Sequence, residues 1–246
     1  GAIISNGDMS IYNTDFIDNT TGNGSGGALY LYSDYNHHIE GSNFINNVSA
    51  RNGGTSEGGA IQIGVESTKL GSLDIISSTF KGNIANNNGN ASSSGIGGAL
   101  QLAGIDTSIS SSIFGGTGTD EGNKANRGGA IAITNNVGSH TIDSSKFINN
   151  EATTYGGAIY NEEGSLTVKN SVFDGNKTTN VIPGGNPSGT QSSGGAINNT
   201  SGTLTIENTS FSNNHANRDG GAIRSSGGTV NISNTDFINN TAGWSG

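Results

Sequence analysis

Apolar side chains recur along this chain in one fixed frame. Each of the eight phenylalanines follows an Ile or Val by five residues and a Ser or Thr by two residues. An Asn stands three residues after each phenylalanine, except in the fourth unit, where Thr117 takes that place. The frame Ile/Val-x-x-Ser/Thr-x-Phe-x-x-Asn therefore occurs eight times, around Phe16, Phe44, Phe80, Phe114, Phe147, Phe173, Phe211 and Phe237.

Between these frames, apolar and polar residues alternate over short segments. Ile61 and Ile63, for example, stand on either side of the polar Gln62. An alternation with period two among β-branched residues, bounded by Gly, Asn and Ser, predicts β-strands. No segment shows the three-and-four spacing of an amphipathic helix, so we expect an all-β chain.

A second motif, Gly-Gly-Ala followed by Ile or Leu, alternates with the phenylalanine frame. It starts at Gly26, Gly58, Gly97, Gly128, Gly156, Gly194 and Gly220, and Gly1-Ala2-Ile3 matches it without the first Gly. The spacing from Ala to Ala ranges from 26 to 39 residues. A unit this short fits one turn of a coil of three short strands better than a domain. Eight such coils predict a parallel β-helix roughly 38 Å long, at ~4.8 Å per coil.

Stacking the coils places equivalent side chains above one another. The phenylalanines then form one internal stack, and the Ile or Val positions form another beside it. The Ser or Thr positions predict a hydroxyl ladder at a turn, and the Gly-Gly pair predicts a corner whose dihedral angles exclude a Cβ. Asparagine side chains pair with their copies in stacked β-structures, which predicts a ladder of Asn19, Asn47, Asn83, Asn150, Asn176, Asn214 and Asn240.

Length differences between the units predict loops at a few points of the coil. The extra residues fall at 32–38, 65–71, 84–96 and 177–193, and the last of these segments contains both prolines.

Composition and charge narrow the possible partners. Only 30% of the residues are hydrophobic and 12% are charged, which suits a thin continuous core in a single repeat domain over residues 1–246. The net charge of -9 argues against nucleic acid and against an anionic membrane as partners, because both need clustered Lys and Arg. The chain has no Cys, and no apolar run approaches the length of a membrane span.

The alternating Gly-Gly-Ala-Ile/Leu and Phe-x-x-Asn motifs, which span the whole chain, resemble the repeat of the chlamydial polymorphic outer-membrane proteins. Similar repeats occur in adhesin-like surface proteins of other bacteria and some archaea. The resemblance implies a right-handed parallel β-helix that is exported to the cell surface and acts in adhesion or as a stalk. A right-handed coil also agrees with the general handedness of β crossovers. The motif residues are architectural, so the resemblance carries over no catalytic or binding residue.

Catalysis by a β-helix polysaccharide enzyme would need two or three carboxylates that converge. The candidates do not share a column in adjacent coils, so we interpret them as solvated acids and expect no catalytic site. They are Asp8, Asp15, Asp18, Asp120, Glu121, Glu162 and Glu163.

Metal and cofactor sites are not expected either. His37, His38, His140 and His215 form no metal-binding spacing, and we expect them to be exposed to solvent. Asp120 and Glu121 open a segment that faintly resembles a calcium loop but lacks its spacing.

The strongest candidate for a ligand patch is a group of aromatic residues, Tyr30, Tyr32 and Tyr35. Tyr30 and Tyr32 alternate with leucines, so they face outward if the leucines face the core. Exposed aromatic side chains stack on sugars or anchor a protein partner, although ordinary packing between strands accounts for them as well. We also predict an outward column after the Gly-Gly-Ala motif, and its mixed composition argues against an ice-binding face; it reads Ile4, Tyr30, Gln62, Gln101, Ala132, Tyr160, Asn198 and Arg224.

The two ends of the chain match as two parts of one Gly-Gly-Ala motif, since Gly246 can precede Gly1. This predicts either a segment of a longer array or a fibre subunit with head-to-tail contacts at Ala2, Ile3 and Trp244. The sequence thus favours a non-catalytic surface rod that attaches to a protein or glycan on a host or neighbouring cell. The alternative is a carbohydrate-binding or polysaccharide-degrading β-helix.

Overall fold

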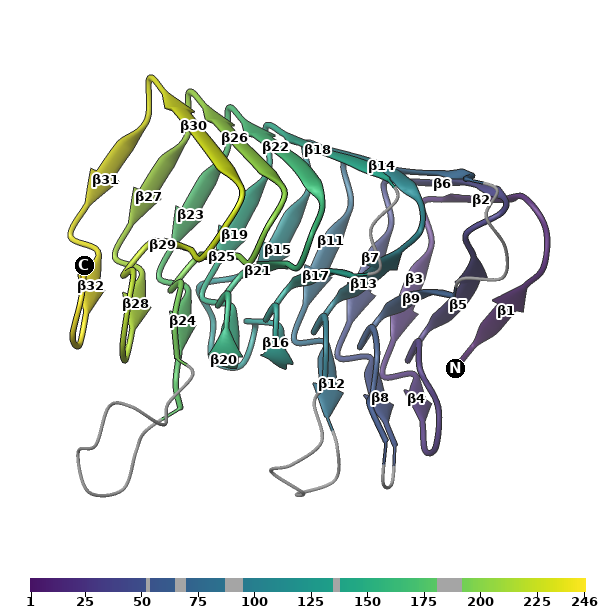
Figure 1. Ribbon diagram of the computed structural model, residues 1–246. Helices are drawn as coiled ribbons and strands as arrows, with labels where there is room; N and C mark the ends of the chain where they lie inside the picture. The colour runs from purple at the N-terminus through teal and green to yellow at the C-terminus, as the bar shows by residue number, and fades with distance from the viewer. Residues whose placement is uncertain (52–53, 65–69, 87–94, 135–137, 181–191) are drawn as a thin grey trace.

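The computed structural model describes residues 1–51, 54–64, 70–86, 95–134, 138–180 and 192–246. In these residues the chain winds into a stack of coils, with its two termini at opposite ends of the stack (Figure 1). Each coil contributes one strand to each of four sheets, and each sheet has eight strands. The predicted parallel β-helix of eight coils is therefore confirmed. The prediction of three strands per coil is wrong, because residues after the Phe-x-x-Asn frame form a fourth strand.

Sheet A follows the Gly-Gly-Ala corners. Within residues 29–32 the side chains alternate: Leu29 and Leu31 are buried in the core, whereas Tyr30 and Tyr32 face the outer side of the sheet. The strands are β1 (Ile3–Ser5), β5 (Leu29–Tyr32), β9 (Ile61–Gly64), β13 (Leu100–Ala103), β17 (Ile131–Thr134), β21 (Ile159–Asn161), β25 (Ile197–Asn199) and β29 (Ile223–Ser225).

Sheet B carries the Ile or Val column of the frame. Ile75 of β10, for example, pairs with Ile39 on one side and with Ile109 on the other. The strands are β2 (Met9–Tyr12), β6 (Asn36–Glu40), β10 (Ser72–Ile76), β14 (Asp106–Ser110), β18 (Ser139–Asp143), β22 (Ser165–Lys169), β26 (Thr203–Glu207) and β30 (Thr229–Ser233).

Sheet C carries the phenylalanines. Neighbouring rings lie parallel, with centroids 4.6–5.1 Å apart, so the eight rings form one continuous stack along the core. The strands are β3 (Asp15–Ile17), β7 (Asn43–Ile45), β11 (Thr79–Lys81), β15 (Ile113–Gly115), β19 (Lys146–Ile148), β23 (Val172–Asp174), β27 (Ser210–Ser212) and β31 (Asp236–Ile238).

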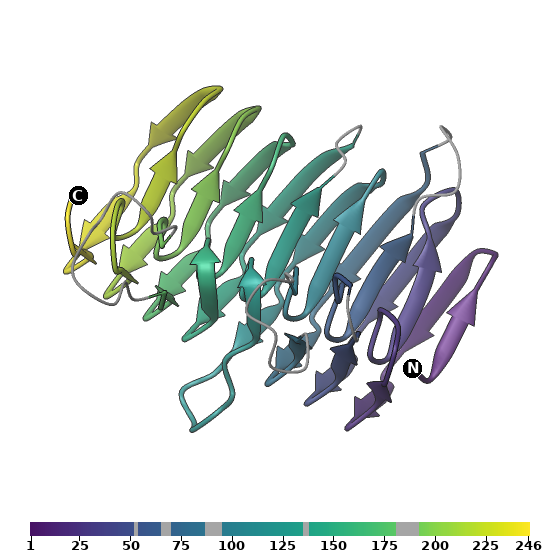
Figure 2. The ribbon, with the colours of Figure 1, turned by 60° about the horizontal axis from the view of Figure 1, so that its bottom comes forward.

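Sheet D is the unexpected fourth sheet. Its inward side chains are small, such as Ala85, Ala125 and Ala152, which leaves little room for a large core on this side. The strands are β4 (Thr20–Thr21), β8 (Val48–Ala50), β12 (Ile84–Asn86), β16 (Lys124–Arg127), β20 (Glu151–Tyr155), β24 (Lys177–Thr178), β28 (His215–Ala216) and β32 (Thr241–Ala242). Figure 2 shows how the strands of neighbouring coils run side by side along the molecule.

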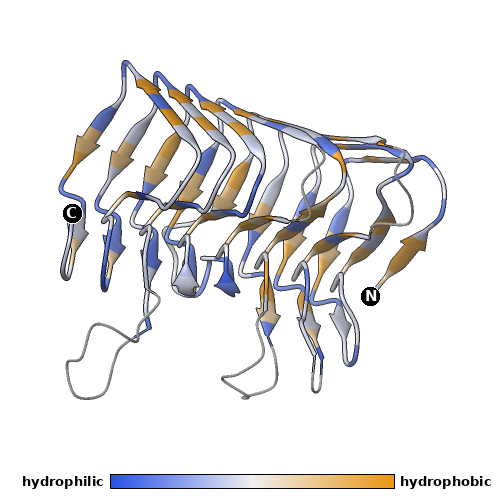
Figure 3. Ribbon diagram, in the orientation of Figure 1, coloured by the Kyte–Doolittle hydropathy of each residue, from blue (hydrophilic) through white to orange (hydrophobic). Residues whose placement is uncertain are grey.

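Colouring by hydropathy shows apolar positions that recur from coil to coil, as expected for one narrow core rather than a globular one (Figure 3). The turn into sheet A depends on the Gly-Gly pair. The first glycine has a positive φ, +63° at Gly156, which L side chains rarely adopt. A Cβ on the second, Gly157, would lie 2.1 Å from the carbonyl oxygen of Gly195 in the next coil, so a side chain there cannot fit.

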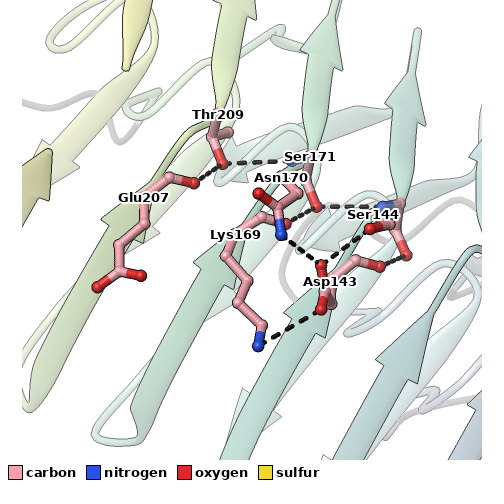
Figure 4. A network of polar contacts seen from close by, with 8 residues as sticks. Asp143, Ser144, Lys169, Asn170, Ser171, Glu207 and Thr209 are labelled. Carbon is pink, nitrogen blue, oxygen red and sulfur yellow. Dashed lines mark hydrogen bonds and ion pairs between the residues drawn. The ribbon is translucent and has the colours of Figure 1, made fainter. Parts of the chain in front are cut away.

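The turn from sheet B to sheet C is closed by a ladder of hydroxyls (Figure 4). The Ser171 hydroxyl donates to the Lys169 carbonyl at 2.7 Å and accepts from the Ser145 backbone N–H at 3.1 Å. The Ser171 N–H in turn donates to the Thr209 hydroxyl in the next coil. Asp143 adds bonds on the outside of the turn, because it accepts from Asn170 at 2.9 Å and pairs with Lys169 at 3.4 Å.

The turn from sheet C to sheet D contains the asparagine ladder. From Asn47 onward, each amide oxygen accepts from the backbone N–H and the side-chain amide of its counterpart in the preceding coil, and each side-chain amide also donates to a phenylalanine carbonyl. In the fourth coil this place belongs to Asn123, not to Thr117, which lies in an exposed loop. The predicted gap in the ladder is therefore wrong, because six extra residues delay the asparagine without changing its position in the coil.

A second, shorter ladder lies inside sheet A and was not foreseen. Asn161 and Asn199 take the inward position that Leu31 and Ile63 occupy in earlier coils, and their side-chain amides are joined by a bond of 2.7 Å. Asn161 also accepts from the Gly164 N–H and donates to the Gly164 carbonyl, so its amide closes the turn to sheet B. These bonds compensate for placing amides in an apolar core.

Candidate functional site

The predicted tyrosine patch lies on the outer side of sheet A near the N-terminal end. Tyr30 and Tyr32 are half-buried, and their rings meet edge to face with centroids 5.2 Å apart. The Tyr30 hydroxyl leans over Gly64 of the next coil, where a side chain would collide with it. Tyr35 is half-buried in the turn that follows β5. Whether the three tyrosines bind a ligand stays a prediction.

The acidic residues considered for catalysis bond mainly to their neighbours. Asp120 pairs with Lys124 at 2.8 Å and Glu121 with Lys81 at 3.2 Å. The hydrogen bond from Lys124 lowers the pKa of Asp120, and the Gly118 N–H lowers that of Glu121, so both stay ionised near neutral pH. Within the described part of the chain, no three residues among His, Asp and Glu come together in a way that could hold a metal ion. The described part also contains no helix long and apolar enough to cross a membrane.

Two of the four histidines contradict the expectation that they are exposed. His37 and His140 face the core of sheet B, in a column otherwise occupied by residues such as Leu73 and Leu166. The Nε2 atom of His37 lies 2.9 Å from the Tyr32 carbonyl. Burial lowers the pKa of His140 to about 4, so its ring is neutral at physiological pH. The spacing could have shown this, because both residues stand two before the buried Ile of their strand.

The outer face of sheet A also differs from the prediction. Several residues of the column after Gly-Gly-Ala are not exposed: Tyr160 retains 4% of its accessible surface, and Gln62, Gln101, Ala132 and Asn198 are buried as well. The chain covers them itself. The residue just before each Gly-Gly corner pairs with its copy in the next coil, and this bridge row runs along the face; it consists of Glu57, Ile96, Arg127, Tyr155, Ser193, Asp219 and Ser245.

Side chains of the bridge row meet the outer face of sheet A across the corner. The Glu57 carboxylate accepts a hydrogen bond from the Gln62 side chain, and burial raises the pKa of Glu57. In the middle coils this contact becomes aromatic, because the Tyr155 ring stacks on Tyr160 with centroids 6.1 Å apart. Sequence reasoning missed this pairing. Its signal is the spacing of five residues between the residue before each Gly-Gly pair and the residue after the Ala-Ile that follows.

Arginines cover this aromatic pair from both ends. The guanidinium carbon of Arg127 lies 5.5 Å from the centre of the Tyr160 ring, and that of Arg224 lies 6.0 Å from the centre of Tyr155. The Tyr160 hydroxyl donates to Glu162 at 3.3 Å. Burial raises the pKa of the Tyr155 phenol, and the nearby Arg224 charge opposes this rise. We name Arg127, Tyr155, Tyr160 and Arg224 the Arg–Tyr cluster.

The residues predicted for end-to-end contacts are accessible in this structure. Ala2 and Ile3 are exposed at one end of the stack, and the Trp244 side chain keeps 57% of its accessible surface at the other. The guanidinium carbon of Arg218 lies 5.6 Å from the centre of the Trp244 ring. Ile232 and Phe237 of the last coil are also exposed, at 49% and 47%, because no further coil covers their columns here.

Comparison with known proteins matches two segments of this chain to a family model. Neither the search of curated proteins nor that of solved structures finds a matching protein. The matching family model covers two segments that run from the hydroxyl turn through the phenylalanine and asparagine to the first residues of sheet A. This family belongs to the outer-membrane surface proteins of Chlamydia. Residues 144–162 and 208–226 of this chain match the model of the Chlamydia polymorphic membrane protein (Chlamydia_PMP) repeat.

Proposed function

We propose that this chain is a non-catalytic rod at the cell surface that mediates attachment to a protein or glycan of a host or neighbouring cell. The main support is the contrast between its inside and its outside. The inward phenylalanines and asparagines repeat in every coil, whereas the outward residues change from coil to coil. A rod of this kind holds varied surface residues at fixed positions, as attachment requires.

The cell-surface location is supported by the repeat type, which belongs to outer-membrane surface proteins. The net charge of -9 and the small number of apolar residues suit exposure to water along the whole length of the rod. We therefore propose a location outside the cell for this chain.

Attachment is tested with beads that carry the purified chain at controlled density. We expect these beads to bind a panel of epithelial and bacterial cells more than beads that carry the heat-unfolded chain do. Soluble chain should compete for the same sites. Equal binding by folded and unfolded chain, or no competition, would contradict an attachment function.

The apolar end faces support stacking as a second element of the proposal. Ile232 and Phe237 are exposed in the last coil, whereas the equivalent residues of the inner coils are buried by the next coil. The free edges of the last strands can also pair with further strands. We propose that a second copy docks there through Ala2 and Ile3, with Trp244 at the contact. Electron microscopy over a concentration series should show rods that lengthen. Ile232→Lys should stop this growth, whereas the side-facing change Lys146→Gln should not; rods of constant length at every concentration exclude stacking.

The alternative of a polysaccharide-degrading enzyme is tested directly. Incubation of the chain with acidic and neutral polysaccharides should release no reducing ends. Release that disappears on substitution of Glu57 or Glu162 would overturn the non-catalytic assignment.

A further inference from the structure

The Arg–Tyr cluster concentrates positive charge on a rod that is negative overall. The chain has four arginines, and the charges of three of them, Arg127, Arg218 and Arg224, lower the pKa of Tyr155. Arg218 pairs with Asp219 at 3.2 Å. Because screening limits charge interactions to about 8 Å at physiological salt, this local charge outweighs the distant acids for a small ligand.

Two of these cations have no carboxylate partner in the described residues. Lys81, Lys124, Lys169 and Lys177 each pair with an Asp or Glu. Arg127 and Arg224 form no such pair within the described ranges. Within the described residues, the contacts of Arg224 are a long hydrogen bond of 3.5 Å to the Asn198 side-chain oxygen and its position over the Tyr155 ring. Their charge is therefore available to an anion from outside.

The tyrosines hold both guanidinium groups in place. A guanidinium that lies over a ring keeps its N–H groups at its edges, and these edges bind a carboxylate or sulfate through two parallel bonds. Arg127 and Tyr155 are neighbours in the bridge row, and Arg224 stands three coils after Arg127 in the stack. Both arginines are half-buried, which limits the entropy lost when they bind a ligand.

The surroundings indicate a sugar acid rather than a bare ion. Asn198, the Tyr160 hydroxyl and Glu162 add neutral and acidic hydrogen-bonding groups beside the two cations. Such a mixture of aromatic, amide and guanidinium groups fits the hydroxyls and the single carboxylate of an acidic sugar. A long polyanion is disfavoured, because it would extend beyond the cluster along a rod of net charge -9.

We propose that the Arg–Tyr cluster binds an acidic oligosaccharide, with Arg127 and Arg224 holding its carboxylate or sulfate groups. The proposal rests on the proposed attachment function and names the ligand class of that attachment.

The test uses the whole chain and isothermal titration with trigalacturonate. The neutral methyl ester of the same trisaccharide is the matched ligand. We expect the acid to bind and the ester to bind at least ten-fold more weakly. Arg127→Gln and Arg224→Gln should each weaken binding of the acid about ten-fold or more, since each removes charged hydrogen bonds. Lys146→Gln, which removes an equal charge from an exposed site on sheet C, should leave binding unchanged.

Unfolding curves of both arginine variants should coincide with that of the wild type, as expected for partly exposed positions. Equal binding of acid and ester, or an equal loss with Lys146→Gln, would overturn the proposal. If the arginine variants attach to cells as well as the wild type does, this ligand site is wrong while attachment itself stands. If neither the wild type nor any variant attaches to cells, the proposed attachment function is wrong.

Discussion

A single ladder asparagine satisfies several buried groups at once. The Asn150 side-chain amide donates to the Phe114 carbonyl at 3.0 Å and to Asn176 at 2.9 Å, while its oxygen accepts two bonds from Asn123. Because Asn150 is fully buried, water cannot replace these partners. At the scale of the residue, the fold therefore depends on polar groups as much as on the apolar core.

Asn150→Ala should therefore lower the free energy of unfolding by about 2–4 kcal/mol, since it leaves several buried donors and acceptors without partners. Urea unfolding followed by circular dichroism measures this loss. Asn36→Ala is the control: Asn36 is exposed and accepts one bond from Ser72, so the expected change is below about 0.5 kcal/mol. Equal effects of the two substitutions would show that the ladder adds nothing to stability.

His140 makes stability depend on pH. Its folded pKa of about 4 lies below the ordinary 6.5, so the unfolded state binds the proton more readily between these values. The free energy of unfolding therefore keeps its full value above pH 6.5 with respect to His140. It falls as the pH decreases towards 4, by about 3 kcal/mol at pH 4. Leu73, Leu166 and Leu204 occupy the same column, so His140→Leu should fit the core.

Urea titrations at pH 7 and pH 4.5 check this prediction. The wild type should lose more stability than His140→Leu does over this range. His37, whose pKa burial also lowers, should account for part of the loss that remains in the variant. An identical pH dependence in wild type and variant would show that His140 does not carry the effect.

At the scale of the element, one strand is marginal alone and depends on the strands on either side. β19 is three residues long, yet Phe147 is fully buried because β15 and β23 supply a ring on each face. The same residue type in β31 has only one neighbouring ring and stays 47% exposed. Phe16 at the other end also has one neighbouring ring but keeps only 7% of its accessible surface, so the two ends of the stack differ.

Phe147→Ala should therefore cost about 3–5 kcal/mol of unfolding free energy, the usual range for a buried phenylalanine. Phe237→Ala should cost less than half as much, because much of its ring is already in contact with water. Thermal and urea unfolding of both variants provide the comparison. If the two costs are similar, the last coil is covered in solution, which would favour end-to-end stacking.

At the scale of the whole molecule, stability follows a one-dimensional order. Each coil pairs its strands only with those of the coils before and after it, so the inner coils have two paired neighbours and the end coils have one. The exposed strand β30 at one end contrasts with β22, whose inward residues are fully buried.

Hydrogen exchange should therefore be fastest in the two end coils, β1 to β4 and β29 to β32, and slowest in the inner coils around β18 to β23. Mass spectrometry of peptides after deuterium labelling resolves this gradient. Addition of the chain at high concentration should slow exchange in the last coil if copies stack. Uniform exchange along the whole rod would contradict independent fraying of the end coils.

The sequence by itself determined which residues form the internal columns. Spacing around each phenylalanine identified the ring stack, the hydroxyl turn and seven members of the asparagine ladder, because stacked coils place equal positions above one another. It also indicated the tyrosine patch and the acidic residues, but not whether any of them meet. Fold class followed from the same repeat together with the period-two alternation inside each unit, since a short repeated unit indicates a solenoid and the alternation indicates strands.

Tertiary structure decided everything that depends on contacts across a corner of the coil. It placed Asn123 in the ladder after an insertion, added a fourth sheet, turned His37 and His140 inward and covered Tyr160 with the bridge row. The physical reason is that the periodicity of a sequence shows only on which face of its own strand a side chain lies. The angle between successive strands, and hence which faces meet, is set by turn geometry and packing between coils, which no local spacing contains.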